Sequence, residues 1–92
     1  MKTVYKFTAP HPGESINLDL PVGARIVHFA LQNGRLFLWV ELDPSAPKVQ
    51  RTFLVFGTGW EVVDNSQHLG TVIDAGGFVW HLFEIFQETA NA

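Results

Sequence analysis

The dipeptide Asn33-Gly34 constrains the fold more than any other feature of this sequence. Both residues tolerate the positive φ angles of a type I′ turn, whose twist matches that of two paired strands. The flanking runs, RIVHFALQ (25–32) and RLFLWVEL (35–42), are rich in Val, Leu and aromatic residues. The sequence therefore predicts an antiparallel hairpin centred on this turn.

Counting outward from the turn gives the expected cross-strand pairs, which are Gln32 with Arg35, Leu31 with Leu36, Ala30 with Phe37, His28 with Trp39 and Ile26 with Glu41. Side chains alternate between the two faces of a strand. One face of the hairpin is then entirely apolar, and we assign it to the core: Val27, Phe29, Leu31, Leu36, Leu38 and Val40. The opposite face mixes aromatic residues with His, Arg and Glu, which raises the question of what covers it.

The remaining chain also favours strands, separated by turns rich in Pro, Gly, Asp and Asn. The predicted strands are Thr3–Thr8, Ser15–Leu20, Val49–Phe56, Thr71–Asp74 and Phe78–Phe86. Only residues 61–68 leave room for a short helical turn. We therefore predict one all-β domain over residues 1–92, an antiparallel β-sandwich or small barrel of six to seven strands, with a polar tail at 87–92 that frays.

Composition indicates that either large apolar side chains are exposed or another chain covers them. In 92 residues, 47% are hydrophobic and 16% are charged, whereas an average soluble protein has roughly 25% charged residues. A domain this small has a large surface and few polar side chains with which to cover it. We therefore expect a homo-oligomer, a dimer or larger.

The charge pattern and the cysteine count exclude several classes of function. Six Lys and Arg residues are scattered along a chain of net charge −3, so we expect no binding to duplex nucleic acid. The chain has no cysteine, which excludes disulfides and thiolate chemistry. The N-terminus lacks an apolar signal region and no apolar run is long enough to span a membrane, so we expect a cytoplasmic protein.

The mixed faces of the long strands form the first candidate site. We predict an interface or pocket lined by His28, Phe37, Trp39, Glu41, Trp80, His81 and Glu84. Aromatic residues with a few charges are typical of protein interfaces and ligand grooves. Three interpretations stay open, namely a second core layer within one sandwich, an oligomer interface and a ligand surface.

A second candidate site surrounds the motif GTG at 57–59. Arg51 and Thr52 lie in the strand before it, and Trp60 follows it. An arginine pairs with phosphate and an indole stacks on a base. We therefore predict an anionic, ring-containing ligand held by Arg51, Thr52, Gly57, Thr58, Gly59 and Trp60, although a tight turn explains the glycines equally well.

Nothing in the sequence indicates catalysis, a metal or a cofactor. The four histidines show no metal-ligand spacing, and His28 and His81 meet only if their strands pair. The three serines lack the glycine frame of a nucleophile elbow. We expect no catalytic residues, no metal site, no cofactor and no enzymatic activity.

Several short motifs occur in a distinctive order: MKTVYKF at the N-terminus, QNG before LWV and DP, RTF before GTG, and GTV before FVWHLFE. In these the chain resembles an uncharacterised family of small proteins encoded by phages and prophages. The resemblance spans Met1 to Glu84 and implies a role in the cytoplasm of an infected bacterium.

Many small phage proteins counter host defence by binding, and the aromatic content suits stacking on a ligand. We therefore expect an anti-defence factor that sequesters a small nucleotide-like signalling molecule. The alternatives are an inhibitor that binds a host defence protein and a minor virion or assembly protein.

Overall fold

The computed structural model describes residues 1–87, and within them it contains seven strands and no helix. The strands are β1 (Thr3–Thr8), β2 (Ser15–Pro21), β3 (Arg25–Gln32), β4 (Arg35–Leu42), β5 (Lys48–Gly57), β6 (Ser66–Ile73) and β7 (Val79–Ile85). The prediction of an all-β, antiparallel fold is confirmed. No helix in the described range is therefore available to cross a membrane. Apart from Gln87, the tail expected to fray (87–92) lies outside the described residues.

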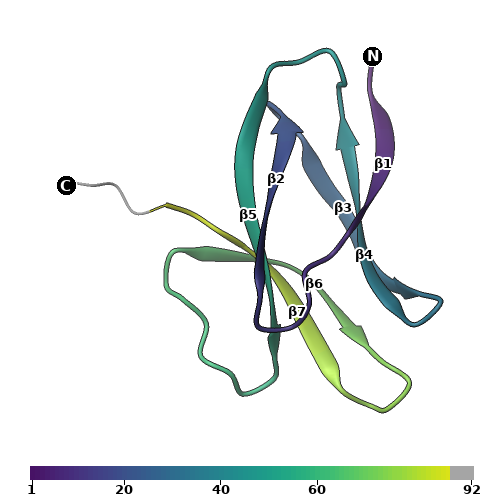
Figure 1. The fold of residues 1–92 in the computed structure, drawn as a ribbon, viewed down its shortest axis with the longest axis vertical. Coiled ribbons are helices and arrows are strands. Elements are labelled where there is room, and N and C mark those ends of the chain that lie inside the picture. The colour runs from purple at the N-terminus through teal and green to yellow at the C-terminus, as the bar shows by residue number, and fades with distance from the viewer. Residues whose placement is uncertain (88–92) are drawn as a thin grey trace.

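The strands form two antiparallel sheets (Figure 1). The three-stranded sheet has the order β1-β4-β3, and the four-stranded sheet has the order β2-β5-β7-β6. The sheets approach closely where β3 faces β6, since a Cβ placed on Gly70 would lie only 3.0 Å from the Cβ of Phe29. Both sheets contribute to one core, as in a sandwich.

The core consists of the inward-facing apolar residues of both sheets. Leu38 and Val40 of β4 meet Phe53 and Val55 of β5 and Leu82 of β7, and all five are fully buried. Burial of such side chains contributes about 1.5–3 kcal/mol each to stability. This alternation of buried and exposed positions fixes the strand register, because a slip by one residue would expose the whole apolar face.

The hairpin forms as predicted near its turn and departs from the prediction at its far end. Asn33 and Gly34 have φ angles of 53° and 77°, and the pairs from Gln32–Arg35 to His28–Trp39 are confirmed. A β-bulge at Val27 then shifts the register. Ile26 pairs with Val40 and packs on the core, whereas Val27 is 39% exposed.

The predicted pairing of Ile26 with Glu41 and the predicted burial of Val27 are therefore wrong. Arg25 instead pairs with Glu41. The physical reason is the extra residue of the bulge, which moves every earlier side chain to the opposite face. Val and Ile are equally apolar, so their alternation did not reveal which of the two would be buried.

Strand β6 is longer than predicted and includes residues 66–68 of the segment considered for a helical turn, while residues 61–65 form a connection that is not helical. It begins at Ser66, which pairs with Ile85, and contains a second bulge at Leu69. The first residues of β6 are polar because their side chains lie at the surface of an edge strand. Pairing with β7, rather than local apolar periodicity, decides their conformation.

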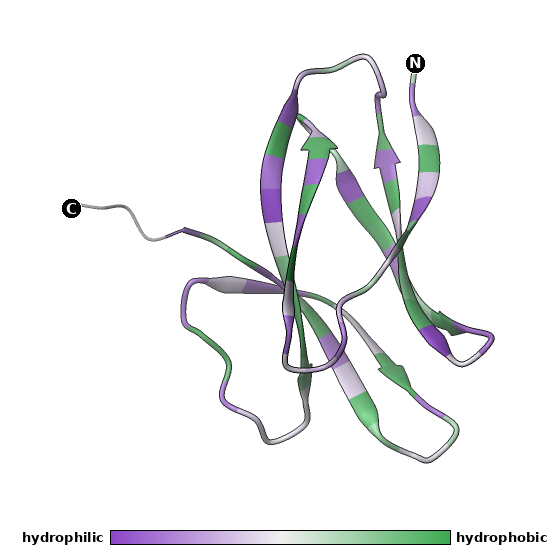
Figure 2. Ribbon diagram, viewed as in Figure 1, coloured by the Kyte–Doolittle hydropathy of each residue, from purple (hydrophilic) through white to green (hydrophobic). Residues whose placement is uncertain are grey.

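Strand β5 lies between β2 and β7 and extends along most of the four-stranded sheet (Figure 1). Its first half is mostly hydrophilic and its second half mostly hydrophobic (Figure 2). Arg51 therefore lies in the polar half, and Gly57 lies at the apolar end. At about 3.3 Å per residue, these two positions are roughly 20 Å apart.

Candidate functional site

Arg51 is engaged within the protein. Its Nε and Nη2 donate to the two carboxylate oxygens of Glu84 at 2.7 and 2.6 Å, and its Nη1 donates to the carbonyl oxygen of Ala24 at 2.6 Å. The Glu84 side chain is 8% exposed and the Arg51 side chain 21%. A bidentate pair of this kind holds both groups in place.

The other residues of the second predicted site are separated from Arg51. Thr52 points to the opposite face of β5, where its hydroxyl donates to Asn17. The turn 57–60 closes with a hydrogen bond from the Trp60 amide to the Gly57 carbonyl, and Gly59 has a φ of 89°. Arg51 and this turn thus belong to different parts of the sheet and do not form a single site.

The indole of Trp60 folds back over Gly57. A Cβ on Gly57 would lie 2.8 Å from the indole Cε2, so only glycine permits this close approach. The Trp60 ring also contacts Trp80 edge to face, with ring centroids 5.9 Å apart. Gly57 therefore has a packing role, and Gly59 supplies the positive φ that the alternative interpretation of a tight turn requires.

The predicted interface set is divided among three surfaces. His28, Phe37, Trp39 and Glu41 lie together on the outer face of the three-stranded sheet, where the His28 and Trp39 rings are 5.5 Å apart. His81 lies on the outer face of the four-stranded sheet. Trp80 and Glu84 lie on the inner face of β7, beside the buried Leu82.

The placement of Trp80 and Glu84 on a non-core face is therefore wrong. The sequence pattern places the glutamate-bearing face of this strand outside the core, because the opposite face carries no carboxylate. Glu84 is instead accommodated inside because Arg51 neutralises it. The mixed face of the hairpin does lie outside the core. No segment of residues 1–87 forms a second layer over it.

The outer face of the three-stranded sheet carries an aromatic row with charged neighbours. Phe37 and Trp39 contact edge to face at 6.2 Å, and the Lys6 ammonium lies 4.6 Å from the centre of the Phe37 ring. Lys2 and Arg25 lie 3.7 and 3.6 Å from Glu41. We call His28, Phe37, Trp39 and Glu41 the outer aromatic face.

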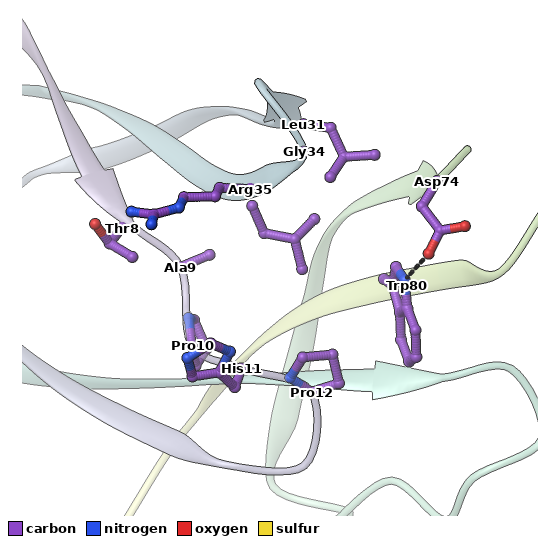
Figure 3. Close-up of a pocket in the computed structure, with 11 residues that line it drawn as sticks. Thr8, Ala9, Pro10, His11, Pro12, Leu31, Gly34, Arg35, Asp74 and Trp80 are labelled. Carbon is purple, nitrogen blue, oxygen red and sulfur yellow. Dashed lines mark hydrogen bonds between the residues drawn. The ribbon is translucent and has the colours of Figure 1, made fainter. Parts of the chain in front are cut away.

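A cleft of about 440 Å³ opens where the two sheets meet the β1–β2 loop (Figure 3). Three segments that are distant in sequence build it, and its lining is Thr8, Ala9, Pro10, His11, Pro12, Leu31, Gly34, Arg35, Leu36, Asp74 and Trp80. Such a volume is within the usual range for small-molecule sites, about 300–1,000 Å³. We call it the inter-sheet cleft.

Asp74 and Trp80 form one side of the inter-sheet cleft (Figure 3). The Trp80 Nε1–H donates to one carboxylate oxygen of Asp74 at 3.0 Å, and the amides of Gly76 and Phe78 donate to the other at 2.9 and 3.0 Å. The indole bond first, and then the backbone bonds, hold the pKa of Asp74 below its usual 3.8. Asp74 is thus anionic at neutral pH and fixes the orientation of Trp80.

The opposite side of the inter-sheet cleft is cationic or neutral. Arg35 and Thr8 lie there, and the loop with Pro10, His11 and Pro12 borders both sides (Figure 3). Among the described residues, no carboxylate forms an ion pair with Arg35. The cleft thus combines an indole, an unpaired guanidinium and an oriented carboxylate.

A second cavity, of about 460 Å³, lies beyond Trp80 and is lined by Gly57, Thr58, Trp60, Gly77, Phe78, Val79 and Trp80. Phe78 stacks on Trp80 at 6.1 Å and is 65% exposed. The residues of the GTG turn border this aromatic cavity. Trp80 is the wall that the two cavities share.

The sequence indicated Trp80 as a site residue but not its partners in the inter-sheet cleft. The alternation places Arg35 only on the mixed face of the hairpin, and Asp74 ends the predicted strand 71–74. Loop residues 9–12 carried no chemical signal, because prolines in a connection are expected. These residues come together in the inter-sheet cleft only because the two sheets pack against each other, and no local motif encodes that packing.

The fold and the cleft define a small, two-sheet antiparallel domain with an aromatic and charged recess between its sheets. The family model described as Domain of unknown function (DUF7352) matches residues 1–91, and the chain belongs to this family. No curated protein and no solved structure matches the chain.

Proposed function

We propose that this protein is a non-enzymatic binding protein that takes up a small, anionic, nucleotide-like molecule in the inter-sheet cleft. One observation carries the proposal: Arg35, which forms no ion pair within residues 1–87, lies in the same cleft as the indole of Trp80. A guanidinium recognises phosphate with two parallel hydrogen bonds, and an indole stacks on an aromatic base. The two groups match the two chemically distinct halves of a nucleotide.

The charges of the cleft suggest the orientation of such a ligand. Asp74 repels a phosphate from the side of Trp80, and Arg35 attracts it to the other side. The base would then lie against Trp80, where the carboxylate of Asp74 can accept hydrogen bonds from an amino group or a ribose hydroxyl. This arrangement supports a nucleotide-like ligand over a simple inorganic anion.

The proposed ligand class is the one expected from the sequence, but different residues bind the ligand. Arg35 takes the role first given to Arg51, whose guanidinium is engaged by Glu84. Trp80 takes the stacking role first given to Trp60. The turn 57–60 contributes indirectly, because Trp60 packs on Trp80.

The resemblance to phage-encoded proteins suggests what such binding accomplishes. A phage accessory protein that sequesters a nucleotide signal would silence a host defence in the bacterial cytoplasm. The outer aromatic face supports the accompanying proposal of a homo-oligomer, since it offers apolar surface with balanced charge for a second subunit.

The test is equilibrium dialysis of the purified chain against cyclic dinucleotides, cyclic mononucleotides and linear nucleoside phosphates. Retention of one of these is expected, and Arg35→Gln should weaken it at least about tenfold, because a hydrogen bond to a charged group contributes about 1.5–3 kcal/mol. Arg25→Gln is the matched control, an exposed arginine on the outer face. Complete recovery of every compound, or equal binding by both variants, would refute the proposal. A monomeric mass at high concentration would refute the oligomer.

A second candidate function is that of an inhibitor that binds a host defence protein. It is favoured by the same outer aromatic face, which no described segment covers. Affinity capture from bacterial lysate with the wild type and with Trp39→Ser tests it. If both capture the same proteins, the face is not the binding surface. A third candidate is a minor virion protein. If this is correct, mass spectrometry of purified phage particles should detect the chain.

A further inference from the structure

Four side chains form a hydrogen-bonded row on the outer face of the four-stranded sheet. The Thr58 hydroxyl lies 2.8 Å from Nε2 of His81, whose Nδ1 lies 3.0 Å from the hydroxyl oxygen of Thr71. That same oxygen lies 2.8 Å from Nε2 of His68. Two imidazole nitrogens, from different strands, are therefore directed at one point.

The bulge at Leu69 produces this convergence. In a regular strand, residues 68 and 71 would lie on opposite faces, because the side-chain period is two. With the bulge, His68 pairs with Phe83 and Thr71 pairs with His81, so His68, Thr71 and His81 lie on the same face of the sheet. The sequence spacing of the histidines gave no sign of a metal site because it could not show this bulge.

Aromatic rings, rather than carboxylates of the described strands, border the two histidines. The described strands of this face bring no carboxylate to the pair; its neighbours are Phe83, whose ring is 5.3 Å from that of His68, and Phe56. The Thr58 hydroxyl can accept a hydrogen bond from Nε2–H of His81. Nδ1 of His81 then presents its lone pair, as second-shell partners arrange for metal-bound histidines.

We propose that His68 and His81 form a binding site for a divalent transition-metal ion such as Zn²⁺ or Ni²⁺. Imidazole nitrogen is the ligand these ions prefer. Within residues 1–87 there is no group of three or more His, Cys, Asp or Glu side chains placed to hold a metal. The protein therefore supplies two nitrogens, and water completes the coordination, with the Thr71 oxygen as a further donor.

Small side-chain rotations complete this geometry. A metal requires roughly 2.0–2.1 Å to each nitrogen, and each nitrogen already lies within 3.0 Å of the Thr71 oxygen. His68 is exposed on an edge strand and lies outside the buried core, so its imidazole can turn without disturbing that core. The ion would occupy the position between the rings, whose centroids are 6.1 Å apart.

The test is a titration of the tag-free chain with NiCl₂, followed by the imidazole signals of the four histidines in ¹H–¹³C NMR. The signals of His68 and His81 should broaden at lower metal concentration than those of His11 and His28. By zinc titration calorimetry, His68→Gln should weaken binding at least tenfold, whereas His28→Gln should not change it. Arg35→Gln should also leave metal binding unchanged, which separates this site from the inter-sheet cleft.

Thr71→Val distinguishes the metal site from a purely structural hydrogen-bonded row. If the row is structural only, this variant loses stability and zinc has no effect on the melting temperature of the wild type. The proposed site predicts that zinc raises the melting temperature of the wild type and of Thr71→Val, but not of His68→Gln. Simultaneous broadening of all four histidines, or equal zinc affinity of His68→Gln and wild type, would overturn the proposal.

Discussion

The buried pair of Arg51 and Glu84 gives the sharpest test of how this fold is held together. Glu84→Gln keeps the shape of the side chain and removes its charge, so two charge-assisted hydrogen bonds to the guanidinium are weakened. A hydrogen bond to a charged group contributes about 1.5–3 kcal/mol to stability. Because Arg51 is partly open to water, we expect the free energy of unfolding to fall by about 2 kcal/mol. That is a large share of the roughly 5–15 kcal/mol that stabilise a native domain.

Arg51→Met should cost more, about 3 kcal/mol, because it leaves the Glu84 carboxylate buried without a partner. It also removes the donor to the Ala24 carbonyl. The double variant Arg51→Met/Glu84→Leu should lose less than the sum of its two single changes, since neither charge is then left alone.

Urea denaturation followed by circular dichroism measures these losses. Glu41→Gln is the control, because Glu41 has only surface partners at 3.6 and 3.7 Å and should change stability by less than about 0.5 kcal/mol. The reasoning is refuted if Glu84→Gln and Glu41→Gln unfold at the same urea concentration. It is equally refuted if the Arg51 and Glu84 effects add without coupling.

Three further predictions follow from single contacts. Gly70→Ala should cost about 2 kcal/mol in urea denaturation, because its new methyl would meet the buried Phe29 at 3.0 Å; an unchanged midpoint would contradict this close approach. Asp74 has a lowered pKa in the folded state, so its stabilisation is present above pH 3.8 and is lost as the pH falls through the folded-state value. The melting temperature of Asp74→Asn should thus fall less than that of the wild type between about pH 5 and pH 2. An equal fall in melting temperature for both proteins would contradict the hydrogen bond between Asp74 and Trp80. Asn33→Ala should cost about 1 kcal/mol because of its φ of 53°, whereas Asn33→Gly should be nearly neutral by the same urea assay.

The hairpin shows how far local sequence determines this fold. The Asn-Gly turn and the apolar alternation are local signals, and they predicted the register correctly as far as His28 and Trp39. The bulge at Val27 has no local signal, since Ile26 and Val27 are equally apolar and either could face the core. A single extra residue there was enough to reverse the assignment of Ile26.

The face of strand β7 that carries Trp80 and Glu84 was wrongly predicted to lie outside the core. A glutamate in an apolar run normally marks the solvent side. That rule failed because Arg51, two residues from the position opposite Glu84 on the adjacent strand, reaches its carboxylate. The inter-sheet cleft was not predictable for a similar reason. Its walls come from a proline-rich loop, the tip of a hairpin and a turn, and only the packing of two sheets brings Arg35 and Trp80 into one cavity.

The two bulges have a consequence for aggregation. Strands β3 and β6 are edge strands of their sheets, and each is interrupted by one bulge. A straight, exposed edge presents free amide and carbonyl groups that recruit strands from other molecules, and a bulge disrupts that template. At another edge, β2 ends in Pro21, which has no amide hydrogen to donate. At these three edges the protein should therefore resist the open-ended strand addition that produces fibrils.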